Sequence, residues 1–227
     1  SRACLLSGQY TPRHGVYVVN PANPKDAKVH NVPNSRRMPD GVVSMAHELV
    51  GSLDVAGDTV SFDGGLGYIE TDWGRNFPQT WVWMHAFVGG ASVMVSIARV
   101  PFLGGSFPGF LAAVLLPEGD GLVRFATWTG ARIADLSTDD TSARVVLEDD
   151  EWRLEVEATI GHPVDLAGPS PLGMDRTVVE GIVGPVSVML WRNGEVMLEG
   201  RTTGGGVEVH GSAYQREWLT EPGWRRP

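Results

Sequence analysis

Apolar and polar residues alternate with a period of two over much of the chain after residue 50. The clearest case is residues 152–160, where one set of alternate positions is apolar and the other is charged or carries a hydroxyl. The apolar positions are Trp152, Leu154, Val156, Ala158 and Ile160, and the polar ones are Arg153, Glu155, Glu157 and Thr159. This period is typical of a β-strand with one buried and one solvated face.

Three pairs of such segments are separated by short turn sequences and predict antiparallel hairpins. The turns are Gly57-Asp58, Asp149-Asp150 and Asn193-Gly194, and the last is typical of a type I′ turn because both residues tolerate positive φ. Each turn determines which residues face each other across its hairpin. The expected cross-strand pairs are Val55–Val60, Leu53–Phe62, Leu147–Trp152, Val145–Leu154, Ala143–Val156 and Trp191–Val196.

Closely spaced hairpins with few helix signals favour an all-β fold, either an antiparallel barrel or a sandwich. We expect residues 53–211 to form it, with little helix. The composition agrees, because 29 Gly and 15 Pro supply turns and 8 Trp are large rings to bury. The 227 residues suffice for one large all-β domain or two small ones.

The net charge and the cysteine content limit the possible partners and functions of the protein. A formal net charge of −9 argues against a nucleic-acid partner or an anionic membrane surface bound through a general basic field. The one cysteine, Cys4, excludes an internal disulfide, and there is no zinc motif. The most apolar stretch, residues 93–116, is interrupted by Arg99, prolines and glycines, so it predicts buried strands and no transmembrane segment. The sequence does not indicate the cellular compartment.

The first 40 residues differ in character from the rest. Residues 20–40 are polar and rich in proline, and they predict a loop or linker. Residues 1–16 resemble the signature of type I sulfatases, in which Ser-Arg-Ala follows a cysteine that is converted to formylglycine. That cysteine would fall before Ser1, and Cys4 is followed by Leu-Leu-Ser, so we expect no sulfatase activity. The lack of an initial methionine predicts that the chain is a fragment.

A longer resemblance is carried by four stretches that follow one another in order. They are Gly67-Tyr-Ile-Glu-Thr-Asp-Trp-Gly-Arg with its flanks in residues 64–84, Arg99-Val-Pro-Phe-Leu-Gly-Gly-Ser-Phe-Pro-Gly-Phe, Arg124-Phe-Ala-Thr-Trp-Thr-Gly-Ala, and Gly206-Val-Glu-Val-His-Gly. Over about residues 41–211 the chain resembles the tocopherol cyclase family. The resemblance implies an antiparallel lipocalin-like, calycin-type barrel and cyclisation of a prenylated hydroquinone to a chromanol, without redox cofactor or metal.

The expected organisation has three parts. They are a sulfatase-like remnant and linker at 1–40, a tocopherol-cyclase-like barrel at 41–215 and a tail at 216–227. The family has another half before the Gly-Tyr-Ile-Glu segment, so the barrel is expected to be incomplete. After Met84 the family's Gln-x-Asn-His-Phe is replaced by His85-Ala-Phe-Val, so the family's Asn-His pair is missing.

The implied chemistry begins with protonation of an alkene, which needs a carboxylic acid kept neutral in an apolar pocket. Glu70 and Asp72 are the candidate catalytic residues, because on a strand they share one face with Tyr68 and two neighbouring carboxyls raise the pKa of one of them. Indole rings would stabilise the carbocation, and phenylalanines would line a channel for the prenyl tail. The candidate substrate-binding residues are Tyr68, Trp73, Trp81, Trp83, Arg99, Phe102, Phe107 and Phe110.

Several of these residues also have a purely structural interpretation. Glu70 and Asp72 fit a charged strand end in which Asp72 pairs with Arg75. Trp81 and Trp83 fit a core strand, and Arg99 fits an ion pair at a barrel mouth. His85 and His210 look isolated and are expected on strand surfaces.

The functional alternative is a non-catalytic lipocalin-like binder of a prenyl lipid or pigment. In either case the expected partner is a hydrophobic small molecule, and peripheral membrane contact stays open. A third interpretation is a sulfatase fragment that lacks its nucleophile. A fourth is that the junction between the sulfatase-like and the cyclase-like parts is a sequence-assembly artefact with no evolved combined function.

Overall fold

The computed structural model describes residues 40–72, 78, 80–102, 105–117, 121–170 and 173–211. For residues 40, 71–72, 100–102, 105–107, 169–170, 173, 175 and 182 it describes the backbone alone. All strand pairs are antiparallel, and no α-helix occurs in the described residues, so the all-β prediction is confirmed. The expectations for residues 1–39 and 212–227 lie outside the described residues. The chain divides into two compact units, Ser1–Arg75 and Asn76–Pro227.

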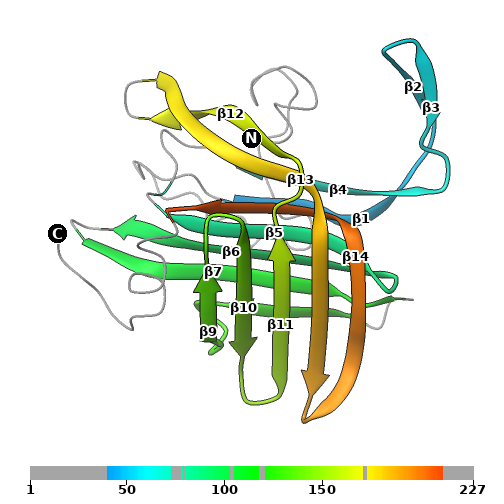
Figure 1. Cartoon of the computed structure of the whole chain (residues 1–227). Coiled ribbons are helices and arrows are strands. Elements are labelled where there is room, and N and C mark those ends of the chain that lie inside the picture. Colours follow the sequence, from blue (N-terminus) through cyan, green and yellow to red (C-terminus); the bar gives the residue numbers. More distant parts are fainter. Residues whose placement is uncertain are drawn as a thin grey trace. The chain divides into compact units, whose positions relative to one another are not determined.

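The described part of the first unit is a long two-stranded ribbon (Figure 1). Strand β1 (Asp40–Leu49) pairs with β4 (Gly65–Asp72), and β2 (Ser52–Val55) pairs with β3 (Asp58–Ser61). The imidazole of His47 lies over Gly67, its cross-strand partner, where a Cβ would be 2.3 Å from Nε2. Gly67 therefore lets this side chain pack flat on the ribbon.

The second unit is built on a ten-stranded sheet with the order β8-β7-β6-β5-β14-β13-β11-β10-β9, and β12 pairs with β13. The sheet curls on itself into a nearly closed antiparallel barrel (Figure 1). Its strands are β5 (Trp81–Val88), β6 (Ala91–Phe102), β7 (Gly105–Leu115), β8 (Leu122–Ala126), β9 (Arg132–Thr138), β10 (Ser142–Glu148), β11 (Trp152–Thr159), β12 (Pro163–Ser170), β13 (Gly173–Arg192) and β14 (Glu195–His210).

The buried hydrophobic residues of the second unit form one core cluster. Strands from both ends of the sheet order contribute to it, including Ile97 and Phe125 from one end and Val145 and Leu154 from the other. The alternation predicted for residues 152–160 is confirmed, because Leu154, Val156 and Ala158 are buried and Trp152 and Ile160 pack against the same cluster. The barrel is therefore held mainly by burial of alternate aliphatic side chains.

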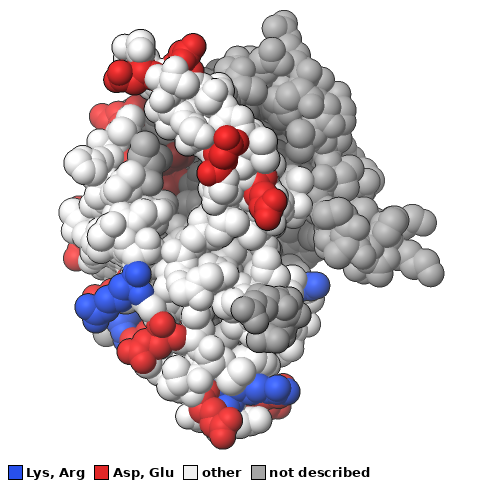
Figure 2. Space-filling model, turned by 90° about the vertical axis from the view of Figure 1, so that its right-hand side faces the viewer, with Lys and Arg blue, Asp and Glu red and all other residues white. Residues whose placement is uncertain are grey.

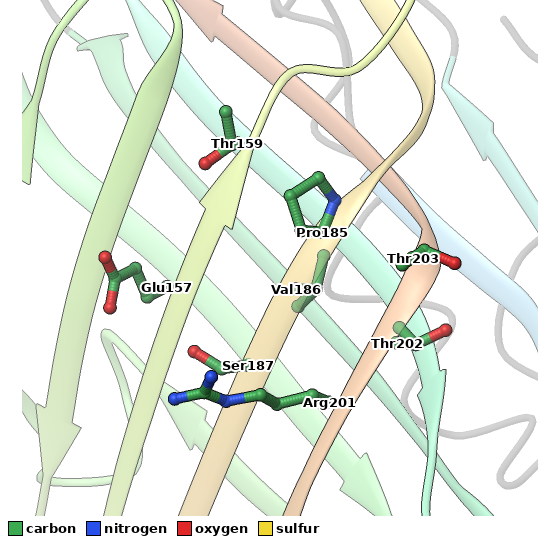
Figure 3. Close-up of a pocket in the computed structure, with 8 residues that line it drawn as sticks. All are labelled: Glu157, Thr159, Pro185, Val186, Ser187, Arg201, Thr202 and Thr203. Carbon is green, nitrogen blue, oxygen red and sulfur yellow. The ribbon is translucent and has the colours of Figure 1, made fainter.

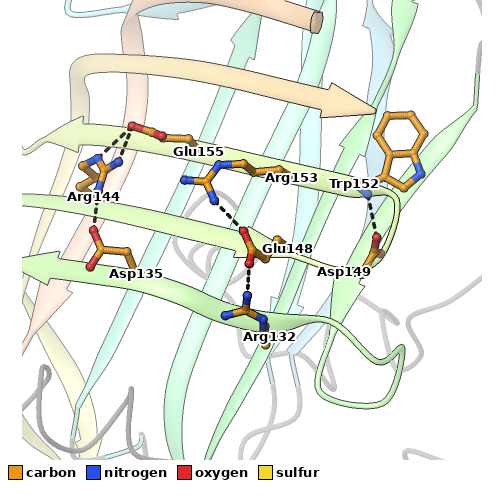
Figure 4. Close-up of polar contacts among 8 residues, drawn as sticks. All are labelled: Arg132, Asp135, Arg144, Glu148, Asp149, Trp152, Arg153 and Glu155. Carbon is orange, nitrogen blue, oxygen red and sulfur yellow. Dashed lines mark hydrogen bonds and ion pairs between the residues drawn. The ribbon is translucent and has the colours of Figure 1, made fainter. Parts of the chain in front are cut away.

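The outer face of β9, β10 and β11 carries ion pairs between neighbouring strands (Figure 4). Arg144 on β10 pairs with Asp135 on β9 and, at 2.8 Å, with Glu155 on β11. Glu148 pairs with Arg132 and, at 2.6 Å, with Arg153. These side chains are all at least partly exposed, so each ion pair by itself adds little to the free energy of unfolding. The pairs place opposite charges, and not like charges, next to one another across the three strands.

The Asn193-Gly194 hairpin is confirmed. Both turn residues have positive φ, of 50° and 85°, and Trp191 faces Val196. The registers that were expected for the two other hairpins are wrong by two positions.

In the β10–β11 hairpin, Leu147 faces Leu154 instead of Trp152, and the two other expected pairs shift in the same way. Asp149 begins the turn because its Oδ1 accepts hydrogen bonds from the amides of Glu151 and Trp152, at 2.9 and 2.7 Å. A shift of two preserves the alternation, so the predicted buried face survives.

In the β2–β3 hairpin the turn lies one residue earlier than expected. Ala56 and Gly57 form it, with φ of 53° and 97°. Positive φ at both central positions is the requirement of a type I′ turn, and here alanine meets it beside glycine. The observed pairs are Leu53–Val60 and Val55–Asp58, in place of Leu53–Phe62 and Val55–Val60.

Strand β13 changes partner along its length. Its second half pairs with β11, whereas its first half pairs with β12, and the register shifts around Gly184. A Cβ on Gly184 would lie 2.1 Å from the carbonyl oxygen of Thr159, and one on Gly161 would lie 1.8 Å from that of Val183. Glycine is thus required where the strand bends away from β11.

Candidate functional site

Strand β5 is buried on both faces, and the face that is not part of the core carries aromatic and polar groups. β5 lies between β6 and β14, with Val82 and Met84 in the core cluster. The opposite face presents Trp81 and Trp83, which pair in register with His210 and Glu208 on β14. We call these four residues, together with Arg176 on β13, the tryptophan cluster.

Trp81 contacts Glu208, His210 and Arg176 in the tryptophan cluster. Its Nε1 donates a hydrogen bond to Oε2 of Glu208 at 3.0 Å, in a buried position. The imidazole of His210 stacks on the indole with centroids 4.4 Å apart and an interplanar angle of 16°. The guanidinium carbon of Arg176 lies 5.1 Å from the indole centroid. The Thr80 hydroxyl donates to the His210 carbonyl oxygen at 2.9 Å.

Electrostatics keep His210 neutral near pH 7. Burial and the nearby positive charge of Arg176 lower the pKa of His210 below its ordinary value. Burial also lowers the pKa of Arg176, which still remains a cation, and its Nη1 donates to the Pro78 carbonyl oxygen at 2.9 Å. Both effects disfavour the protonated form, so the imidazole of His210 is a weak base.

Trp83 lies against glycine on the neighbouring strand. A Cβ on Gly206 would be 3.1 Å from Cζ3 of Trp83, so a larger residue there would push the ring away from β14 by a few tenths of an ångström. Further along β5, His85 Nε2 is 3.1 Å from the Ser92 hydroxyl, and its ring meets Phe87 edge-on with centroids 4.9 Å apart. The non-core face of β5 thus carries rings at four successive alternate positions.

A second aromatic–carboxyl pair lies in the first unit, on β4. The Tyr68 hydroxyl donates to Oε2 of Glu70 at 2.6 Å, and Glu70 is only 4% exposed. Ile69 between them is exposed, as strand alternation requires. The expected shared face of Tyr68 and Glu70 is therefore confirmed. The side chain of Asp72 and all of Trp73 and Arg75 lie outside what is described.

The remaining predicted residues do not all join the tryptophan cluster. Arg99 is buried, at 3% exposed, and the regular pairing of β5, β6 and β7 places it on the core face with Ile97. Phe110 faces Ile97 and is part of the core. Phe102 and Phe107 lie on β6 and β7, and their side chains are not described.

Sequence reasoning missed three members of the tryptophan cluster. The expectation that His85 and His210 are isolated surface residues is wrong, because both make ring contacts. The stretch Gly206-Val-Glu-Val-His-Gly held a signal: Val207 and Val209 face the core, so Glu208 and His210 must point to the face of Trp81. Nothing in the local sequence indicated Arg176.

A polar depression of about 610 Å³ lies over β11, β13 and β14 (Figure 3). It is lined by none of the predicted site residues but by Glu157, Thr159, Pro185, Val186, Ser187, Arg201, Thr202 and Thr203. Its lining combines hydroxyl and charged side chains with the apolar Pro185 and Val186. On the face drawn in Figure 2, acidic side chains are scattered over the described surface. The Lys and Arg side chains on that face form no continuous basic area.

Two kinds of feature are absent from the described part of the chain. Within it, no group of three or more His, Cys, Asp or Glu side chains is arranged to hold a metal ion. The same part contains no helix of the length and apolarity needed to cross a membrane.

Comparisons with known proteins give a family for most of the chain. Residues 38–211 match the family model described as tocopherol cyclase-like. No curated protein matches the sequence. A similar solved structure is that of kievitone hydratase from Nectria haematococca, with 12% identity and a TM-score of 0.44. The alignment covers 76% of this chain and 52% of that one, so this chain spans about half the length of that protein.

Proposed function

Because this chain belongs to the tocopherol cyclase-like family, we propose that it cyclises a prenylated hydroquinone to a chromanol. The observation that carries the proposal is the buried Glu70 carboxyl with the Tyr68 hydroxyl at 2.6 Å, on a strand inside the family match. Burial disfavours the charged form of a carboxyl, so Glu70 is a suitable acid for an apolar substrate.

The reaction is an isomerisation and its atoms balance without a co-reactant. A carboxylic acid transfers its proton to the alkene carbon nearer the ring, which leaves a tertiary carbocation. The phenol oxygen then forms a carbon–oxygen bond to that cation, and the phenol proton passes to a base. We assign proton donation to Glu70, with Asp72 as the alternative donor.

The other roles follow the chemistry of the side chains. Indole rings stabilise a carbocation through their π-faces, which suits Trp81 and Trp83. The further proposed substrate-binding residues are Tyr68, Trp73, Arg99, Phe102, Phe107 and Phe110.

One observation favours the alternative of a non-catalytic binder of a prenyl lipid or pigment. Tyr68 donates its hydrogen bond to Glu70, and donation to a carboxylate stabilises the charged form, which cannot protonate an alkene. The family's Asn-His pair is also replaced by His85-Ala-Phe-Val.

Incubation of the purified chain with a prenylated hydroquinone distinguishes these functions. Chromanol formation is followed by chromatography, and binding by quenching of tryptophan fluorescence. A hydroquinone with a saturated tail is the matched control, because it binds in the same way but has no alkene. Conversion of the unsaturated compound alone supports the cyclase, binding of both without conversion supports the binder, and binding of neither overturns both.

The organisation of the chain is a separate proposal. We infer that residues 1–40 are a sulfatase-like remnant and linker, that 41–215 form the barrel domain and that 216–227 are a tail. The first part resembles a piece of an α/β enzyme whose central sheet is absent. Limited proteolysis should cut between Asn20 and Met38 and leave residues 50–211 intact, whereas equal protection of both parts would contradict the proposal.

A further inference from the structure

The polar depression over β11, β13 and β14 lies on the outer wall of the barrel. Its central row crosses three strands, because Glu157 pairs in register with Ser187 and Ser187 pairs with Arg201. Val186 and Val188, on either side of Ser187, belong to the core cluster, so Ser187 and its two cross-strand partners point outwards. None of the proposed substrate-binding residues lines the depression, so a ligand held there is independent of the proposed function.

The row is hollow in the middle because the central strand carries short side chains. Pro185 and Ser187 on β13 form the floor, and the longer side chains of Glu157 and Arg201 come from the strands on either side (Figure 3). All four residues lie on paired strands, so the sheet holds the shape of the depression in the absence of a ligand. Its volume of about 610 Å³ lies within the range of small-molecule sites.

Arg201 has no carboxylate partner among the described residues. On the same outer face Arg144 and Arg153 each form an ion pair with a glutamate of a neighbouring strand. In the described part of the chain no ion pair joins Arg201 to Glu157 or to another acidic side chain. The Arg201 side chain instead extends from β14 across β13 towards Ser187 (Figure 3). Its guanidinium is therefore available to a ligand in the depression.

The two charges of the depression select the kind of ligand. A guanidinium next to a serine hydroxyl is a set of hydrogen-bond donors that suits a carboxylate or a phosphate. Glu157 lines the other side, and its carboxylate would repel a ligand that is only an anion. The same carboxylate attracts an ammonium group. A molecule that carries both charges therefore fits better than either ion alone.

We propose that this depression binds a small zwitterion, with a carboxylate or phosphate group on Arg201 and Ser187 and an ammonium group on Glu157. The backbones of β11 and β14 are two strands apart, which is about 9.5 Å in a sheet. The two long side chains reduce this span to that of a molecule with a few methylenes between its charges. Those methylenes would lie over the ring of Pro185.

NMR titration of the purified, isotope-labelled chain tests the site without any quinol. The probes are O-phosphoethanolamine and γ-aminobutyrate, which carry a phosphate or a carboxylate at one end and an ammonium group at the other. Inorganic phosphate and ethanolamine each have one of the two charges and should bind about ten-fold more weakly. Arg201→Gln and Glu157→Gln should each weaken zwitterion binding by about ten-fold or more, and added salt should weaken it as well.

Two charged residues outside the depression provide the matched controls. Arg124 on β8 and Glu199 on β14 are exposed, and neither lines the depression. Arg124→Gln and Glu199→Gln remove the same charges from the same unit and should leave binding unchanged. Ser187→Leu fills the floor without changing the charge and should weaken binding of both zwitterions. Circular dichroism and thermal unfolding establish that every variant folds.

Each outcome decides for or against the zwitterion site. Binding of either zwitterion that depends on both Arg201 and Glu157 supports it, and the preferred probe shows whether the ligand carries a phosphate or a carboxylate. Equal binding of inorganic phosphate and O-phosphoethanolamine, unaffected by Glu157→Gln, would identify a simple anion site and overturn it. Equal losses in the control variants, or no resonance shifts with either zwitterion at about 10 mM, would also overturn it. Failure of the cyclase proposal would leave these results unchanged, because no conversion is measured.

Discussion

The two units each contain a buried carboxyl that accepts a hydrogen bond from an aromatic side chain, but the two pairs are built differently. Tyr68 and Glu70 are two residues apart on β4 and share a face by alternation alone. Trp81 and Glu208 are 127 residues apart and meet because β5 pairs with β14. The first pair is local, and the second exists only once the barrel has formed.

The donors also differ in chemistry. A tyrosine hydroxyl both donates and accepts, so the Tyr68–Glu70 pair has a proton that can be exchanged. An indole N–H only donates and does not titrate, so Glu208 can hold Trp81 in place but receives no proton from it. We therefore expect Glu70 to act on substrate and Glu208 to act as a positioning residue.

The largest expected effect is that of Glu70→Gln. The amide keeps the shape of the side chain but has no acidic proton, so cyclisation should fall by about 100-fold or more. Fluorescence-detected binding of the hydroquinone should stay near that of the parent chain. Asp72→Asn is the matched variant on the same strand, and at least one of the two should abolish turnover. Unchanged turnover in both would mean that the acid lies elsewhere.

Glu208→Ala should be the next largest effect, and on stability. It leaves the Trp81 Nε1 donor buried without its carboxylate acceptor, which costs about 1–3 kcal/mol in the free energy of unfolding. Glu208→Gln retains an acceptor oxygen and should cost less, so the difference between the two variants measures the hydrogen bond. Denaturant unfolding gives both values. If Glu208→Gln reduced cyclisation as much as Glu70→Gln does, the proposed division of roles would be wrong.

The same contrast explains what could be predicted from the sequence. Alternation identified the core face of β11 and the shared face of Tyr68 and Glu70, because both depend on residues two apart. It could not assign Trp81 to a cluster, since β5 is buried on both faces and its partners come from β13 and β14. Hairpin registers failed where Asp149 or Ala56 changed the turn, which periodicity does not encode.

Tyr68→Phe should change the pH dependence more than the maximal rate. The hydroxyl donates to the charged form of Glu70, so its removal should raise the pKa of that carboxyl. An acid catalyst is active while protonated, and the alkaline limb of the rate profile should therefore move to higher pH. Steady-state rates between pH 4 and about 9 would test this. A limb that moves to lower pH would show that the hydroxyl supports the neutral acid instead.

The smallest effect concerns His210 and the pH dependence of stability. Its folded-state pKa is lowered by burial and by Arg176, so below the unfolded-state value of about 6.5 the unfolded chain binds a proton that the folded chain resists. Stability should therefore fall as pH drops below that value, until the folded imidazole is protonated too. The effect is small because the ring is only half buried.

His210→Gln should flatten the fall in unfolding midpoint between pH 7.5 and about 5.5. It should also lower the midpoint at both pH values, because the stack on Trp81 is lost, so the slope is the decisive quantity. The exposed His162 provides the matched control, since His162→Gln removes a histidine without touching the tryptophan cluster. An unchanged slope in His210→Gln would exclude this imidazole as the group responsible.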